Sequence, residues 1–240
     1  MNKERFRFFR TVHHESDLMV GVSHNSYQQD MEHFVKGELI RLRELIEAYS
    51  KKDPRFISSL DPIELIPSEN ASEIQTMISC GQKSGTGPMA AVAGMFAQEI
   101  GKALLTSFGT TEVVVENGGD LYLRNEKDLV SVIHAGTSQL SKKIGFVVPP
   151  GEWGIGTSSG TVGHSFSKGQ ADAVTVIGPS APLADSWATA IANHVLSPDD
   201  LDRELDAVDG IPEILACAII VENRIGIRGD LQVKLLSSEE

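Results

Sequence analysis

Cysteines and long apolar runs are scarce in this chain of 240 residues, and each scarcity excludes a class of protein. The two cysteines, Cys80 and Cys217, lie far apart and provide neither a disulfide framework nor the paired spacing of a zinc site. No apolar run approaches the roughly 20 residues that cross a bilayer. The first residues, MNKERFRFFR, lack the apolar core of a signal peptide. We therefore expect a cytoplasmic protein without a membrane partner.

Positively charged residues are also fewer than negatively charged ones. The chain has 21 Lys and Arg residues against 33 Asp and Glu residues, so its formal net charge is -12. A protein that binds nucleic acid neutralises phosphates with Lys and Arg, and an acidic excess argues against that class. One phosphorylated small molecule remains a plausible partner, because backbone N–H groups and a metal ion can hold it locally.

The hydrophobic pattern predicts a mixed order of strands and helices. Expected strands cover 4–13, 17–23, several segments within 112–148, then 153–160, 171–178 and a meander from Cys217 onward. Expected helices cover 27–49, 71–80, 89–104, 182–195 and 201–208. This order is not the regular alternation of a doubly wound parallel sheet, so we expect an α+β fold with mixed or antiparallel sheets. No repeat or low-complexity linker divides the chain, which favours a single domain over 1–240.

The expected helix over 89–104 is rich in alanine and glycine. Small residues on a helix allow a neighbouring element to pack very close. We expect this helix to be central and buried. The pattern leaves open whether its small residues serve an internal core or the seam of a homodimer.

A glycine-rich run, Gly85-Thr86-Gly87-Pro88, precedes that helix. It is close to a dinucleotide-binding fingerprint, with Glu116 as the ribose-binding acid, although no clean apolar strand precedes it. A glycine turn that feeds a close-packed helix explains the same residues. A third interpretation is a phosphate or flavin contact at a helix N-terminus.

A second motif, Gly156-Thr-Ser158-Ser-Gly160, matches the nucleophile elbow of serine hydrolases. The remaining triad members would be Asp185 and His194, which lie on one expected helix, and no helix follows the serine. A loop of glycine and hydroxyl residues can equally cradle phosphates.

The third motif is Ala184-Asp185-Ser-Trp-Ala-Thr189. Asp185 and Thr189 are four residues apart, so a helix places their oxygens on one face. A carboxylate and a hydroxyl suit Mg²⁺, which binds few protein oxygens and adds substrate phosphates. An acidic residue that stabilises the helix dipole, beside a threonine bonded to its own helix, is the alternative.

A fourth cluster, Asn117-Gly118-Gly119-Asp120, lies between two expected strands. Taken alone, it indicates a hairpin turn.

Taken in order, these clusters resemble the ApbE-like superfamily, whose best-known members are FAD:protein FMN transferases. The likeness covers about residues 80–195 and has two parts. One is the strand that ends in Asn117-Gly-Gly-Asp120. The other is Thr157-Ser-Ser-Gly160, then His164, then the Val174-Thr-Val strand and the Ala184-Asp-Ser-Trp-Ala-Thr helix. The opening residues look more like an uncharacterised branch of that superfamily than like the transferases.

The resemblance implies a role for each matched residue. Asp185 and Thr189 would hold Mg²⁺, and Asp185 and His164 would serve the chemistry. Contacts to the flavin nucleotide would come from three backbone segments: Gly85, Thr86 and Gly87; Asn117, Gly118, Gly119 and Asp120; and Ser158, Ser159 and Gly160. The transferases cleave FAD at its pyrophosphate and pass FMN to a hydroxyl of an acceptor protein. We would then expect Asp185→Ala to abolish turnover with little change in melting temperature.

Two segments depart from the superfamily pattern. The histidine loop is shortened to His164-Ser-Phe-Ser-Lys168-Gly169, and the usual Lys-Gly segment before the central helix is replaced by Gly85 to Gly94. Three functions therefore stay open: Mg²⁺-dependent transfer of a flavin from FAD or FMN, binding of a flavin or another phosphorylated small molecule without transfer, and a different enzyme on the same scaffold.

Overall fold

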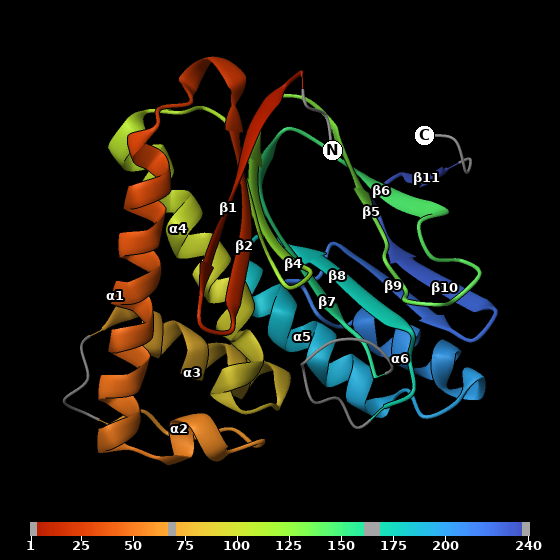
Figure 1. Cartoon of the computed structure of the whole chain (residues 1–240). Coiled ribbons are helices and arrows are strands. Elements are labelled where there is room, and N and C mark those ends of the chain that lie inside the picture. Colours follow the sequence, from red (N-terminus) through yellow and green to blue (C-terminus); the bar gives the residue numbers. More distant parts are fainter. Residues whose placement is uncertain (1–3, 67–70, 161–168, 237–240) are drawn as a thin grey trace.

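The computed structural model describes residues 4–66, 71–160 and 169–236, and its largest element is an antiparallel sheet of eight strands (Figure 1). Its strand order is β1-β2-β3-β4-β7-β8-β9-β10. The strands are β1 Phe6–His13, β2 Ser16–Ser23, β3 Val113–Asn117, β4 Asp120–Asn125, β7 Gly151–Ser158, β8 Ala173–Gly178, β9 Ala216–Val221 and β10 Arg224–Gly229. Every neighbouring pair is antiparallel, as the α+β prediction requires.

A smaller antiparallel sheet covers part of one face of the large sheet. It has the order β11-β6-β5, with β11 Val233–Leu235, β6 Ile144–Val148 and β5 Leu129–Val132. Apolar side chains of both sheets form the core between them, among them Leu123 and Ile155 from the large sheet and Phe146 from the small one. The β1–β2 hairpin lies beyond this cover (Figure 1).

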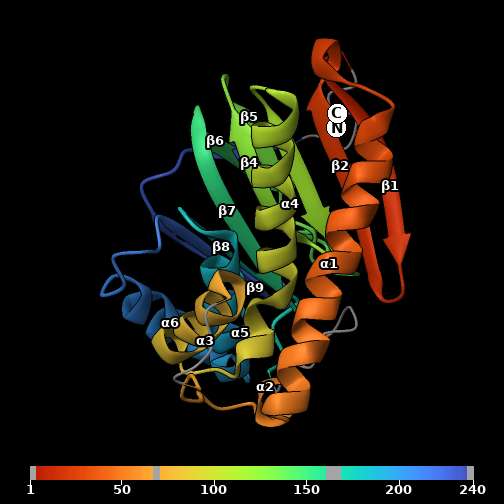
Figure 2. The ribbon, with the colours of Figure 1, turned by 90° about the vertical axis from the view of Figure 1, so that its left-hand side faces the viewer.

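The longer helices lie on the opposite face of the large sheet (Figures 1 and 2). The helices are α1 Asp30–Lys52, α2 Arg55–Ser58, α3 Ser72–Ser84, α4 Val92–Phe108, α5 Ala181–His194 and α6 Leu201–Val208. α1 buries an apolar face at helical spacing: Met31, Val35, Leu39, Leu42, Ile46 and Tyr49. α2 was not expected, because three prolines mark 54–70 as irregular. None of the described helices is long and apolar enough to span a membrane.

The small residues of α4 serve internal packing. A Cβ at Gly94 would lie 2.3 Å from the carbonyl oxygen of Ala181, and one at Gly101 would lie 2.2 Å from the ring of Tyr122. These distances are far below a van der Waals contact. α4 is therefore central and buried as predicted, and its glycines fit α5 and β4 of the same chain.

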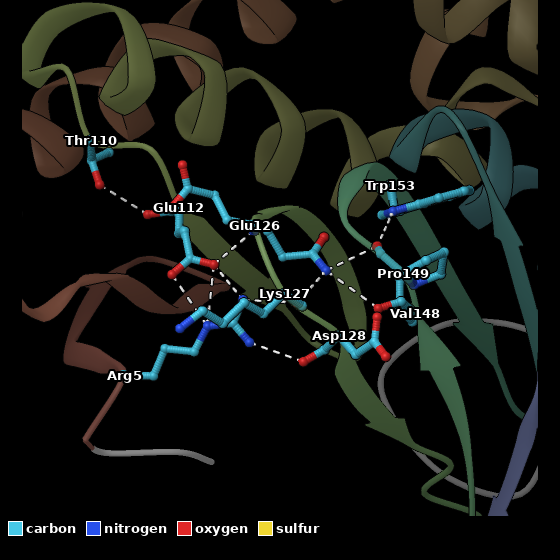
Figure 3. A network of polar contacts seen from close by, with 10 residues as sticks. Arg5, Thr110, Glu112, Glu126, Lys127, Asp128, Val148, Pro149 and Trp153 are labelled. Atoms are coloured by element: carbon cyan, nitrogen blue, oxygen red, sulfur yellow. Dashed lines mark hydrogen bonds and ion pairs between the residues drawn. The ribbon is translucent and has the colours of Figure 1, made fainter.

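A polar network closes the end of the large sheet where β3 begins (Figure 3). Arg5 pairs with Glu112, and its guanidinium donates to the carbonyl oxygens of Lys127 at 2.8 Å and Asp128 at 3.0 Å. Glu112 also accepts the N–H of Glu126 at 2.8 Å. Burial is the largest influence on the pKa of Glu112 and raises it, but the hydrogen bonds from Arg5 and Glu126, together with the charges of Arg5 and Lys127, outweigh burial and lower the pKa. Both charges of this buried pair are thus compensated.

The same network extends to the segment between the two sheets (Figure 3). The Asn125 side chain donates to the carbonyl oxygens of Lys127 and Pro149, both at 2.9 Å. Trp153 donates its indole N–H to the oxygen of Pro149 at 2.8 Å. These bonds connect the end of β4 to the turn between β6 and β7.

Candidate functional site

The other ends of β3 and β4 meet the first turn of α4 and the first turns of α5, and polar side chains gather there. Asp120 accepts the N–H of Thr157 at 3.0 Å, and Asp185 accepts the N–H of Gly94 at 2.9 Å. Asn117 donates its side-chain N–H to the oxygen of Ala93 at 3.3 Å. The structure therefore brings Asn117, Asp120 and Asp185 to one junction between sheet and helices.

Asp185 is a buried carboxylate without a cationic partner among the described residues. Asp185 is only 8% exposed. Burial raises the pKa of Asp185 well above its ordinary value, the charge of Asp120 raises it further, and the N–H groups of Gly94 and Ala93 oppose the shift. Asp185 thus accepts hydrogen bonds at the N-terminus of α4, a helix other than its own.

Asp120 is the second buried carboxylate of the junction, at 6% exposure. Burial raises its pKa to about 7, with the hydrogen bond from Thr157 opposing and the charge of Glu116 adding to the shift. Two neighbouring buried carboxylates repel each other when both are ionised. A cation placed between or beside them would relieve that repulsion.

The Asn117–Asp120 cluster is a tight hairpin, as its sequence suggests. Asn117 and Asp120 are paired across β3 and β4, and Gly118 and Gly119 form the turn with φ of 66° and 111°. Such positive φ values favour glycine. The turn also has a consequence for the site, because it aims Asn117 and Asp120 toward the same helices.

Close backbone packing fixes the position of Asp185 over β7. A Cβ at Gly156 would lie 2.4 Å from the backbone N of Asp185, and one at Gly154 would lie 2.1 Å from the N of Ala181. Because only glycine allows this approach, α5 lies directly on the strand. The two glycines alternate along β7, a signal of helix contact on one face that the sequence analysis missed.

Thr189 lies one turn after Asp185 on α5 and is half-buried. No hydrogen bond joins its hydroxyl to another described residue. The described part of the chain has no cluster of three or more His, Cys, Asp or Glu side chains suited to a metal. A carboxylate and a hydroxyl still match Mg²⁺, a hard cation that completes its shell with water and phosphate oxygens. The donor types at this junction therefore fit Mg²⁺.

The serine-glycine motif ends β7 instead of forming an elbow. Ser158 is 5% exposed, and its hydroxyl is buried without a hydrogen bond in the described structure. Ser159 follows it, and Gly160 donates its N–H to the oxygen of Ala171 at 2.9 Å. His164 lies outside the described residues.

Ser158, Asp185 and His194 do not form a serine-hydrolase triad in the part of the chain that the structure describes. Ser158 belongs to β7 and is not held at a strand-to-helix turn. Asp185 is bonded to Gly94, while the exposed His194 faces Glu204 at 3.6 Å. The hydrolase interpretation of this motif is therefore wrong.

The Gly85–Gly87 run follows helix α3 and serves packing. Gly85 ends α3 with φ of 77°, and the buried Thr86 hydroxyl lies 2.8 Å from that of Ser84. A Cβ at Gly87 would lie 1.9 Å from the oxygen of Ser59. A dinucleotide fingerprint needs a strand before the loop, so that interpretation is wrong. Any ligand contact here would use the backbone.

The geometry also changes one expectation about Asp185. We expected Asp185→Ala to leave the melting temperature nearly unchanged, as it would for an exposed metal ligand. The carboxylate is instead buried and holds the first turn of α4, so its removal leaves the Gly94 N–H without a partner.

Comparison with known proteins identifies the fold and the family. The family model described as AbpE bacteria matches residues 1–209. The chain belongs to this family. UPF0280 protein MJ1526 of Methanocaldococcus jannaschii is 34% identical over 232 residues, covering 92% of this chain and 90% of that protein. A UPF0280 protein of Methanoregula boonei is 41% identical over 177 residues and 72% of each chain.

Solved structures of ApbE proteins share the architecture. Flavin transferase ApbE from Vibrio cholerae aligns with a TM-score of 0.62 at 13% identity, over 94% of this chain and 96% of that one. The ApbE protein of Thermotoga maritima aligns with a TM-score of 0.61 at 12% identity, over 94% and 97%. At such identities the likeness establishes the fold alone, which is ApbE-like.

Proposed function

We propose that this chain binds Mg²⁺ through Asp185 and Thr189 and, with it, the phosphates of FAD or FMN, as a Mg²⁺-dependent flavin transferase. The observation that carries the proposal is the junction of two buried, mutually repelling carboxylates, Asp120 and Asp185, at the strand ends of an ApbE-like fold. When bound, Mg²⁺ would neutralise negative charge on the phosphates.

The residues around the metal pair have separate tasks in this proposal. Asn117 and Asp120 hold the first turn of α4 and the end of β7, so the site is built on regular elements. The buried hydroxyl of Ser158 and the backbone of Ser159 and Gly160 offer hydrogen bonds to phosphate oxygens. Gly118 and Gly119, and the backbone of Gly85, Thr86 and Gly87, flank the nucleotide.

Transfer would join FMN to an acceptor hydroxyl. The hydroxyl oxygen forms a bond to the FMN phosphorus, the pyrophosphate P–O bond of FAD breaks, and AMP leaves with that bond's electron pair. A base must accept the hydroxyl proton. In the transferase proposal His164 or Asp185 takes this role, and a raised pKa makes the Asp185 carboxylate a stronger base than an exposed one.

Calorimetric titration with FAD, with and without Mg²⁺, tests the binding site. We expect Mg²⁺-dependent binding that Asp185→Asn and Thr189→Val each weaken at least about tenfold, a change of about 1.4 kcal/mol. Thr106→Val, on an exposed face of α4, is the matched control and should bind like the wild type. Equal affinity with and without Mg²⁺ would contradict the metal assignment.

Release of AMP separates transfer from binding alone. The transferase should release AMP from FAD in the presence of a hydroxyl acceptor, and Asp185→Asn should stop the release. FAD that binds with Mg²⁺ but stays intact would instead favour the second function, a flavin-binding protein without transfer. Absence of flavin binding would favour a different enzyme on this scaffold.

A further inference from the structure

The four edge strands of the described sheets differ in charge. β1 carries Arg7 and Arg10, β10 carries Arg224 and Arg228, and β11 carries Lys234. β5 has the sequence Leu-Val-Ser-Val and no charged residue. Charged side chains on an edge strand discourage pairing with another chain, and an uncharged apolar edge invites it. β5 is thus the unprotected edge of the described sheets.

The backbone of β5 has two residues available for pairing. Ile133 donates its N–H to Ile144 on the β6 side at 2.9 Å, and Val147 of β6 donates to Gln232 on the β11 side at 2.8 Å. Hydrogen-bonded and non-hydrogen-bonded pairs alternate in an antiparallel ladder. The N–H and C=O groups of Val130 and Val132 therefore point away from β6, and their side chains are 38% and 45% exposed.

A carboxylate near the end of this edge forms no ion pair with another described residue. Glu116 of β3 is half-buried, and no hydrogen bond or ion pair links its side chain to another described residue. Burial raises the pKa of Glu116, the charge of Asp17 adds to the shift, and His134, just after β5, opposes it. Asp17 itself is paired with Arg10. A cationic side chain from outside would complement Glu116.

We propose that β5 is a docking edge for an extended segment of a partner polypeptide, which adds as a strand beside Val130 and Val132 and places a Lys or Arg side chain at Glu116. Main-chain hydrogen bonds give such strand addition its affinity, and side-chain contacts give it specificity. Glu116 points to the face of β3 opposite Asn117, because neighbouring residues of a strand alternate. The docking edge is therefore separate from the flavin site.

The test uses a fluorescein-labelled peptide, Lys-Val-Thr-Val-Thr-Val, and fluorescence anisotropy. Val132→Pro deletes an N–H that β6 does not use, a change that edge strands tolerate. We expect it to weaken binding about fivefold, the effect of one lost backbone hydrogen bond. Val12→Pro on β1, at a valine that is 52% exposed, is the matched control and should bind normally. Glu116→Gln should abolish the preference for lysine over norleucine in the peptide.

Several outcomes would overturn the proposal. Lack of peptide binding at millimolar concentration would do so, as would equal losses in Val132→Pro and Val12→Pro. A peptide N-methylated on the amides that would donate to β5 gives the same test if Val132→Pro fails to fold, and undiminished binding of that peptide would refute strand addition. A dimer in sedimentation velocity that Val132→Pro dissociates would assign the edge to a second copy of this chain instead.

Discussion

The two ends of β3 and β4 contain similar buried carboxylates but differ in whether those carboxylates are paired with a cation. At one end, Glu112 is paired with Arg5 and its pKa is lowered. At the other, Asp120 and Asp185 are both buried without a cationic partner among the described residues, the charge of Asp120 acts on Asp185, and both pKa values are raised. A buried charge is stable when it is paired, and an unpaired one favours its neutral form. The first end therefore has a structural role, and the second is the end at which we propose that a cation binds.

The largest expected effect concerns the compensated end, where Glu112 pairs with Arg5. Glu112→Ala should lower the free energy of unfolding by about 3 kcal/mol, because it removes the carboxylate that pairs with the largely buried Arg5 guanidinium and accepts the Glu126 N–H. Urea denaturation measures this loss. The double change Arg5→Met with Glu112→Gln should cost clearly less than Glu112→Ala, and a larger loss in the double variant would refute this account of the pair.

The uncompensated end, which holds Asp120 and Asp185, should respond differently to loss of the Asp185 carboxylate. Asp185→Ala should cost about 2 kcal/mol, because the Gly94 N–H loses its acceptor in a buried site. Asp185→Asn keeps an acceptor oxygen and removes the buried charge, so its stability should stay within about 1 kcal/mol of the wild type. Equal thermal stability of the wild type and the alanine variant would show that Asp185 does not hold α4.

The packing that creates the uncompensated end can be disturbed without touching its charges. Gly156→Ala should destabilise the protein by about 2 kcal/mol, because its Cβ would lie 2.3 Å from the backbone of Ala184. Gly37→Ala, on α1 with open space around it, is the control and should be neutral or stabilising by up to about 1 kcal/mol. Chemical denaturation of both variants measures these changes. A neutral Gly156→Ala would contradict the close packing of α5 on β7.

The last comparison is the pH dependence of stability, which has opposite sign at the two ends. Asp120 binds its proton more tightly in the folded state, so its contribution to stability should fall as pH rises from about 4 to about 7. The pKa of Glu112 is lowered, so its contribution is present above its ordinary value of 4.5 and is lost as pH falls through the folded pKa.

Denaturation at several pH values, with EDTA present, separates these contributions. Asp120→Asn should make the free energy of unfolding depend less on pH between about 4 and 7. Glu112→Gln should make it depend less on pH in the acid range. Added Mg²⁺ should oppose the loss above pH 6 if the cation binds the ionised carboxylates. If the free energy of unfolding changes equally with pH in the wild type and in Asp120→Asn, then Asp120 does not cause the pH dependence.

The sequence by itself determined most of the elements, because hydrophobic period and glycine position are local properties, but it missed the short helix α2. The α+β order, the buried α4 and the Asn117–Asp120 turn followed from it. It also placed Asp185 and Thr189 on one helix, since a spacing of four residues suffices for that. The resemblance carried by these motifs led to the right family.

Only the tertiary structure decided what these residues touch. The contact of Asp185 with Gly94 spans 91 positions, and no periodic pattern predicts such a pair. The packing of Gly87 on Ser59 and of Gly156 on α5 is equally long-range, so glycines that suggested phosphate loops proved to be points of close backbone approach. The pKa of a carboxyl follows its burial and its neighbours, and both are set when the strands and helices meet.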